Sequence, residues 1–208
     1  MFNYQVIWPL FELAAKGTDM KFIADEKELS ASEELCSDDA IIEVDSLEIC
    51  VLETSGKFQL KDKARFGYDH VKDAFAALSM LRKIFKKYCY AKSTAKQLKI
   101  YFVHARERVS LSKLPMAAKE AASTLTLGNF AWKLKTSLLE TMKILNEMKR
   151  EHEDYMFSSQ ISQDIEAGEN LFSYVEREIK KPERGSGYGL LLPDELEEYE
   201  VRTEVKGQ

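Results

Sequence analysis

Two carboxylates stand at the ends of two short apolar runs, and they are the residues of this sequence best suited to chemistry. Asp39 comes directly before the first run, residues 40–44, and Glu53 ends the second, residues 47–53. Both runs are rich in β-branched and aliphatic residues, and the Asp-Ser pair at 45–46 between them favours a tight turn. In a hairpin that turns there, the two carboxylates meet at the open end. Such a pair can hold Mg²⁺, which assists phosphodiester hydrolysis.

The elements that must position these carboxylates follow from hydrophobic periodicity. Residues 3–15 have helical spacing, and residues 20–23 suit a short strand. After the hairpin, residues 68–88 carry apolar side chains at steps of three and four, which predicts the clearest helix of the chain. Residues 97–105 alternate in a way that predicts a central strand with both faces covered, and residues 109–114 are its candidate hairpin partner.

The chain beyond these strands is predicted to be helical. Residues 129–155 place apolar side chains along one stripe, with Asn129 as a candidate cap. A weaker helix is expected over residues 160–181, before a breaker run and an acidic tail. The predicted organisation is therefore an α/β core over residues 1–114, a helical extension over 115–181, and a hinge and acidic tail over 182–208.

This order of elements, with acids on the hairpin, resembles the PD-(D/E)XK nuclease superfamily, whose restriction-endonuclease-like fold has an αβββαβ core. In that family an Asp begins the second core strand, and an acid-x-Lys triplet ends the third. Asp39 matches the first position, Glu53 matches the acid, and Glu12 stands where many members carry a further acid on the first helix. The resemblance covers roughly residues 2–112. It implies an α/β fold with a mixed sheet, extended here by C-terminal helices.

The triplet departs from the family pattern at its last residue. It is Glu53-Thr54-Ser55, so a serine stands where the family has the lysine that positions or activates the attacking water. A serine hydroxyl cannot supply that positive charge. Two other lysines could replace it: Lys57, one strand repeat further along, and Lys72, near the start of the following helix, where some members of the superfamily carry it.

The resemblance implies a nuclease-related, nucleic-acid-binding protein with a degenerate or inactive Mg²⁺-dependent phosphodiesterase site. If the site works, its metal ligands are Asp39 and Glu53, with Glu12 as a third. The catalytic set is then completed by Lys57 or Lys72, which would stabilise charge at the phosphate.

Charge is unevenly distributed along the chain, although the net charge is only −5. Residues 1–56 hold 3 basic and 13 acidic side chains, whereas residues 57–113 hold 15 basic and 4 acidic. The basic segment favours contact with the phosphates of DNA or RNA, but it could equally neutralise the acidic segment within one fold. The candidate phosphate contacts are Lys57, Lys61, Lys63, Arg65 and Lys72.

The rival interpretation is a non-enzymatic protein-interaction scaffold that retains only the nuclease fold. Its partner-binding element would be the helix at 129–155, whose apolar stripe contains methionines. His104 alternates with apolar residues of its strand and is expected to be structural, because no metal-ligand spacing surrounds it.

Composition and motifs argue against several other classes of protein. No apolar stretch is long enough to cross a bilayer, so no membrane partner is expected. The 3 cysteines include no Cys-x-x-Cys pair, which argues against a disulfide framework or a zinc site and favours an intracellular protein. The sequence also lacks the glycine-rich phosphate loop, the dinucleotide-binding motif and the Gly-x-Ser-x-Gly elbow.

Overall fold

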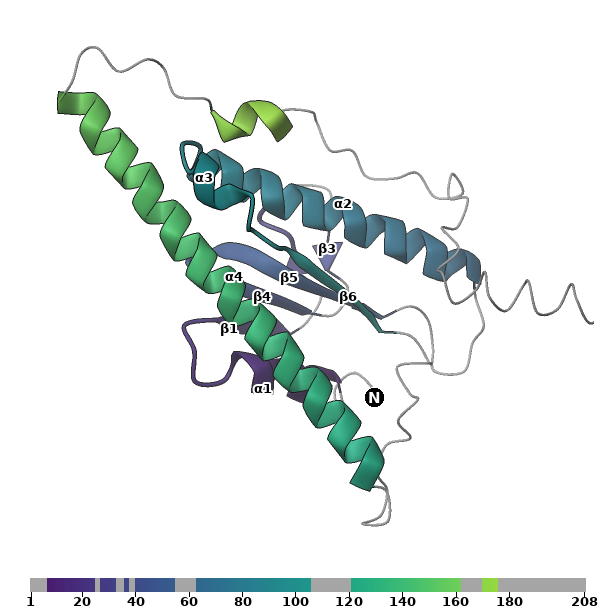
Figure 1. Ribbon diagram of the computed structural model, residues 1–208. Coiled ribbons are helices and arrows are strands. Elements are labelled where there is room, and N and C mark those ends of the chain that lie inside the picture. Colours follow the sequence, from purple (N-terminus) through teal and green to yellow (C-terminus); the bar gives the residue numbers. More distant parts are fainter. Residues whose placement is uncertain are drawn as a thin grey trace, which may run out of the picture.

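The described residues of the computed structural model form a four-stranded mixed sheet with helices on both faces (Figure 1). The α/β class predicted from the sequence is therefore confirmed, as are a mixed sheet and a long C-terminal helix. No helix in the described part of the chain combines the length and apolarity needed to cross a membrane. The description covers residues 7–24, 27–32, 36–37, 40–54, 63–105, 121–161 and 170–175.

The elements follow one another in the order helix, strands, helices, strand, helix. In the sheet the order is β1-β4-β5-β6. The pairs β1–β4 and β4–β5 are antiparallel, and the pair β5–β6 is parallel. A separate two-stranded sheet pairs β2 with β3. The bounds are α1 Trp8–Ala15, β1 Lys21–Ala24, β2 Lys27–Glu28, β3 Cys36–Ser37, β4 Ala40–Val44, β5 Leu47–Thr54, α2 Lys63–Lys87, α3 Lys92–Ala95, β6 Tyr101–Ala105, α4 Ala121–Ile161 and the 3₁₀ helix η3 Leu171–Val175.

The predicted hairpin forms from β4 and β5, and its turn lies at the predicted pair. Asp45 and Ser46 have φ angles of 49° and 64°. These left-handed values match the twist of a two-residue hairpin loop, and Asp tolerates them because its short side chain can bond locally. The pairing of Ala40 with Leu52 then brings the start of β4 beside the end of β5, next to Glu53.

A β-bulge in the hairpin decides which face of β5 carries its acids. Ile42 pairs with Cys50 and Glu43 pairs with Glu48, so Ile49 is the extra residue of β5. In a regular strand, residues 48 and 51 would lie on opposite faces. The extra residue shifts the alternation by one position, and Glu48 therefore faces α2 together with Val51.

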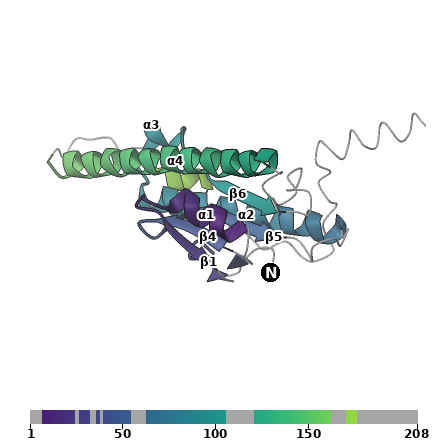
Figure 2. The ribbon, with the colours of Figure 1, turned by 90° about the horizontal axis from the view of Figure 1, so that it is seen from below.

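The two faces of the sheet are covered by different helices. On one face, α2 packs Ala76 and Met80 against Ile41 and Val51. On the other face, α1 and α4 contribute to the larger core, in which α4 supplies Leu134, Leu138, Leu145 and Met148. Figures 1 and 2 show α4 running across the molecule beside α1, with its C-terminal end standing clear of the sheet. The helix therefore packs as part of the main core.

One local prediction is confirmed in part, and another is wrong. Part of the strand predicted at 97–105 forms as β6, which pairs with β5 at an end of the described sheet. Asn129 does not cap a helix, because α4 begins at Ala121 and continues through it. An interior Gly128 or Asn129 costs about 1 kcal/mol or less, which packing of the inward stripe outweighs. The predicted strand at 109–114 lies outside the described residues.

Candidate functional site

The structure describes part of the predicted site. Glu53, Lys72 and Glu12 are described with their side chains. Lys63 and Arg65 belong to the first turns of α2, but the description does not extend to their side chains. Asp39, Lys57 and Lys61 lie outside the described residues.

Glu53 lies at the buried end of β5, under α2. Its exposed fraction is 0%, and its Oε2 is 2.7 Å from Nζ of Lys72, whose side chain is 8% exposed. The strand directs the carboxylate toward the helix, and α2 places its ammonium group directly over it. Because an isolated charge is very unfavourable in such surroundings, the ammonium group is what allows an ionised carboxylate here.

A second buried pair lies beside the first. The parallel register pairs Glu53 with His104 of β6, and Nδ1 of His104 is 3.9 Å from Oδ2 of Asp73, the residue after Lys72. The side chains of His104 and Asp73 are 5% and 1% exposed. We call Glu53, Lys72, Asp73 and His104 the buried polar cluster. It joins β5, β6 and α2, and sequence reasoning missed the contribution of Asp73.

The cluster also affects a neighbouring thiol. Burial raises the pKa of Cys50 to about 12, and the negative charge of Asp73 adds to this rise. Cys50 lies on β5 with an exposed fraction of 0%. The surroundings of the cluster therefore disfavour additional negative charge.

A further buried acid occupies the other end of β5. Glu48 is 1% exposed, and its Oε1 accepts hydrogen bonds from N and Oγ of Ser30 at 2.6 Å and 2.5 Å. Its Oε2 is 3.5 Å from Nζ of Lys83, whose side chain is 28% exposed. Lys83 also donates to Oγ of Ser30. Sequence reasoning missed this site, although an acid inside an apolar run was a signal that could have indicated it.

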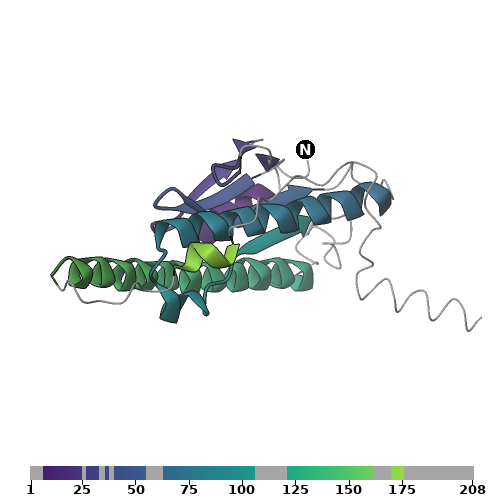
Figure 3. The same ribbon diagram turned by 90° about the horizontal axis from the view of Figure 1, so that it is seen from above.

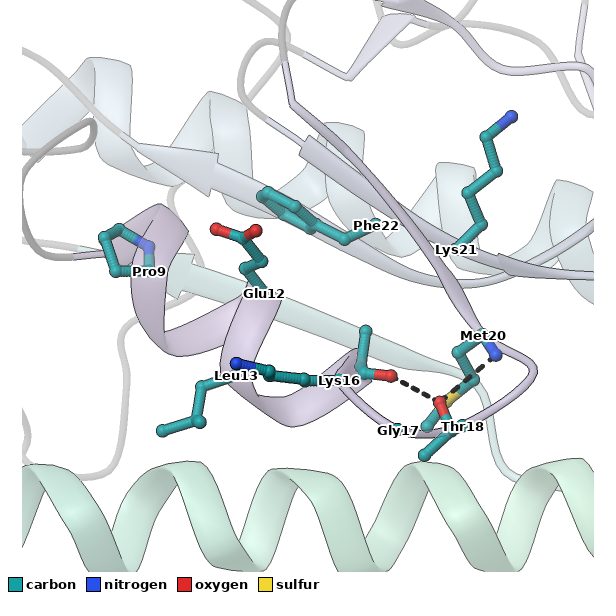
Figure 4. A pocket seen from close by; sticks show the side chains of 10 residues that line it. Pro9, Glu12, Leu13, Lys16, Gly17, Thr18, Met20, Lys21 and Phe22 are labelled. Carbon is teal, nitrogen blue, oxygen red and sulfur yellow. Dashed lines mark hydrogen bonds between the residues drawn. The ribbon is translucent and has the colours of Figure 1, made fainter.

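Glu12 lies in a different place from the buried polar cluster. It is exposed on α1 and lines a hollow of about 600 Å³ between α1, the following turn and β1. Lys16 and Lys21 line the same hollow, whereas Glu53 and Lys72 do not. Figure 4 shows the carboxylate of Glu12 turned toward the ring of Phe22. The structure thus brings Glu53 and Lys72 together but leaves Glu12 apart from them.

The turn that closes this hollow is well defined. Gly17 has a φ angle of 73°, which favours glycine. Oγ1 of Thr18 donates to the carbonyl of Ala15 at 2.5 Å and accepts from N of Met20 at 3.2 Å (Figure 4). These contacts fix the entry into β1, so the hollow is explained by the turn between α1 and the sheet.

The described residues at Glu53 do not by themselves form a Mg²⁺ site, and Asp39, the other predicted ligand, lies outside the described residues. Mg²⁺ needs several oxygen ligands, but an ammonium group stands against this carboxylate and repels a second cation. The described part of the chain contains no group of three or more His, Cys, Asp or Glu side chains arranged to hold a metal. What the described residues provide is a buried carboxylate that is already paired with an ammonium group.

No protein-family model matches this chain, and neither a curated protein nor a solved structure shows significant similarity to it. Its class therefore rests on its own fold and residues. Those define an α/β protein with a mixed sheet, in which a helix carries two cations onto buried acids of the central hairpin.

Proposed function

We propose that the protein is a nuclease-related, nucleic-acid-binding protein with a degenerate phosphodiesterase site. The order α1, β1, β4, β5, α2, β6 supports the proposal, because it follows the αβββαβ order of the PD-(D/E)XK superfamily. Glu53 at the end of β5 supports it as well, since the acid of the family triplet ends the third core strand. The odd cysteine number and the absence of Cys-x-x-Cys lead us to place the protein inside the cell.

The observation that carries the proposal is the buried Glu53–Lys72 ion pair. Ser55 replaces the lysine of the family triplet, and Lys72 comes from the helix to which some members of that superfamily relocate it. In this protein the ammonium group lies directly against the acid, at 2.7 Å and with little exposure. A carboxylate neutralised in this way is a poor cation ligand, so the arrangement favours a site that no longer hydrolyses phosphodiesters.

Burial of Lys72 also narrows the proposed nucleic-acid surface. Its ammonium group is committed to Glu53 and is not placed to contact a phosphate. The candidate contacts that remain are Lys57, Lys61, Lys63 and Arg65. These residues precede or begin α2, so the proposed surface lies along the chain between β5 and the first turns of that helix.

A cleavage assay tests the degenerate site. Supercoiled plasmid and labelled RNA are incubated with Mg²⁺ or Mn²⁺ and the wild type, Glu53→Gln, or Glu43→Gln, a control acid on the neighbouring strand. We expect no cleavage that depends on Glu53. Strong cleavage by the wild type that Glu53→Gln abolishes and Glu43→Gln retains would overturn the proposal. Cleavage gained by Ser55→Lys would support descent from a working nuclease.

One observation favours the alternative, a non-enzymatic interaction scaffold that retains only the fold. The pair Glu48–Lys83 repeats the Glu–Lys arrangement at the other end of the same strand and helix, where the family pattern places no catalytic residue. Both pairs can therefore serve to dock α2. The partner-binding stripe expected on residues 129–155 faces the core, since Leu134, Leu138 and Met148 are buried there.

A further inference from the structure

The long helix α4 has a second apolar face, opposite the one that packs on the sheet. It spans 41 residues, or about 60 Å, twice the diameter of a small domain. Leu125, Trp132, Phe157 and Ile161 have exposed fractions of 73%, 69%, 66% and 67%. In the described part of the chain, most of the large apolar side chains that are exposed belong to this helix.

These four side chains share one side of the helix. At about 100° per residue, they fall within about 40° of one another around the axis. The buried residues Leu134, Leu138 and Leu145 cluster on the opposite side by the same count. We call the side with Leu125, Trp132, Phe157 and Ile161 the outer face of α4. Near the C-terminal half, α3 borders it, held by hydrogen bonds from Ser93 and Thr94 to Glu151.

The outer face is symmetric along the helix. Leu125 and Trp132 occupy its first part, Phe157 and Ile161 its last part, and charged residues the middle. The midpoint of residues 125 and 161 is residue 143, and the midpoint of residues 132 and 157 lies between 144 and 145. A twofold axis near residue 144 therefore superposes the first apolar pair on the second.

The charges between the apolar pairs obey the same symmetry. Glu140 and Arg150 have their midpoint at residue 145, and so do Lys143 and Glu147, which also lie 3.8 Å apart within one helix. An antiparallel second helix aligned on this point would place each acid beside a base of the other copy. Self-complementarity of this kind is what an isologous twofold interface requires.

We propose that the outer face of α4 binds a second copy of this chain, antiparallel, about a twofold axis near residues 143–145. Trp132 and Phe157 are the apolar anchors. Ion pairs between copies, Glu140 with Arg150 and Glu147 with Lys143, select the antiparallel alignment. Low-angle pairing of this type is a common class of helix packing. Because the outer face points away from the core face, the two sheets lie on opposite sides of the helix pair. This proposal does not depend on the nuclease interpretation.

Molar mass in solution tests the interface. Sedimentation velocity on the full chain, over about 1 to 200 µM, should show a dimer that Trp132→Glu with Phe157→Glu converts to a monomer. Leu13→Glu is the control, since Leu13 is also apolar and 53% exposed but lies on α1. Circular dichroism checks that each variant is folded. A wild-type monomer throughout this range, or a dimer that the double variant leaves unchanged, would overturn the proposal.

Cross-linking tests the orientation of the two helices. With the axis near residue 145, Asn146→Cys lies close to its own copy across a helix pair separated by about 9 Å, within reach of a short bis-maleimide. Ser158→Cys lies about 39 Å from its own copy along the axis and should not cross-link beyond the wild-type background. Equal cross-linking of both variants would indicate a parallel pair, and no cross-linking of Asn146→Cys would exclude the proposed axis.

Discussion

A carboxylate can remain charged at 0% exposure in this sheet because an ammonium group stands 2.7 Å from it. Desolvation of both charges offsets most of their attraction, so the Glu53–Lys72 pair adds little net stability. Removal of one partner strongly destabilises the protein, because it leaves a buried charge without its counterion. The pair therefore specifies how α2 docks more than it contributes to the free energy of unfolding.

Glu151 gives the protein a pH-dependent contact at the surface of α4. Partial burial raises the pKa of Glu151, but hydrogen bonds from Thr94 and Ser93 outweigh this effect and hold the pKa below its usual range. Its oxygens accept from N of Ser93 at 2.8 Å, and from N and Oγ1 of Thr94 at 3.0 Å and 2.6 Å. The charged form thus satisfies the first turn of α3.

We expect Glu151→Gln to be less stable than the wild type at neutral pH, by about 1 kcal/mol. A pKa that is lower in the folded state means that the stabilisation is complete above the unfolded pKa and is lost as the pH falls through the folded pKa. The difference between the two proteins should therefore shrink in acid. Urea denaturation between about pH 3 and pH 7 measures it, and a difference that stays constant would contradict this assignment.

Cys50 is predicted to be unreactive in the folded protein. Its pKa of about 12 leaves almost no thiolate at neutral pH, and its side chain is fully buried. Iodoacetamide followed by peptide mass spectrometry should modify Cys50 only when urea unfolds the chain. Cys89, which is partly exposed, provides the internal comparison. Labelling of Cys50 in the native protein at the rate of Cys89 would show that β5 opens locally.

At the scale of elements, two ion pairs set the register of α2 on β5. Lys72 and Lys83 are eleven residues apart, or about 16 Å along a helix. Glu53 and Glu48 are five residues apart, and with the extra residue Ile49 they span roughly 13 to 16 Å along the strand. The two spans are similar, and their order shows that α2 runs antiparallel to β5. Between the pairs, apolar packing fills the interface.

The two pairs should respond differently to loss of the cation. Lys72→Met leaves Glu53 fully buried without its ammonium group, so we expect a loss of about 3 to 5 kcal/mol. Lys83→Met removes a more exposed cation and leaves the equally buried Glu48 with two hydrogen bonds from Ser30, so we expect about 1 kcal/mol. Urea denaturation compares the two variants. Equal losses would mean that the hydrogen bonds from Ser30 do not compensate for the lost cation.

Local sequence patterns predicted the hairpin and the helix α2. An Asp-Ser pair between two β-branched runs leaves one place for the turn, and apolar steps of three and four over residues 68–88 are typical of a helix. The bulge was not predictable, because Ile49 suits either face of a strand. The alternation of residues 97–105 indicated a strand, but local patterns do not encode its parallel pairing with β5.

The candidate site was predictable to the same degree. The acid at Glu53 stood out because it ends an apolar strand, and Lys72 was one of two lysines proposed to accompany it. Lys72 reaches Glu53 only because the whole helix α2 docks on the sheet. Asp73 and His104 are 31 positions apart in the chain, so their contact could not be inferred from spacing.

At the scale of the whole molecule, the described elements form three layers, with α2 on one face of the sheet and α1 and α4 on the other. Figure 3 shows α2 and α4 extending past the strands in different directions. Charge is also divided along the chain, with an acidic segment at residues 1–56 and a basic segment at residues 57–113. At this scale, the basic segment either contacts the phosphates of a nucleic acid or neutralises acidic side chains of the same protein.

Salt dependence separates these two outcomes. If Lys57, Lys61, Lys63 and Arg65 contact phosphates, the log-log slope of affinity against salt should be about −3, from roughly −0.7 to −0.9 per contact. Lys61→Glu with Lys63→Glu should weaken binding to different sequences alike, as measured by fluorescence anisotropy. Lys133→Glu with Lys149→Glu, on exposed positions of α4, is the matched control. Nucleic-acid binding that neither double variant weakens would favour the interaction scaffold. The absence of nucleic-acid binding at low salt would favour it as well.

The parallel pairing of β5 with β6 affects the order in which the elements fold. Cys50 and its partner Tyr101 are 51 positions apart, whereas β4 and β5 are joined by a two-residue turn. Because closing a longer loop costs more entropy, we expect the antiparallel strands to associate first, and β6 and α4 to join afterwards. In stopped-flow experiments, Val51→Ala should then slow folding, while Leu138→Ala, on the inward stripe of α4, should mainly accelerate unfolding. The antiparallel strands, which include Glu53, would thus be assembled before β6 joins the sheet and α4 covers its other face.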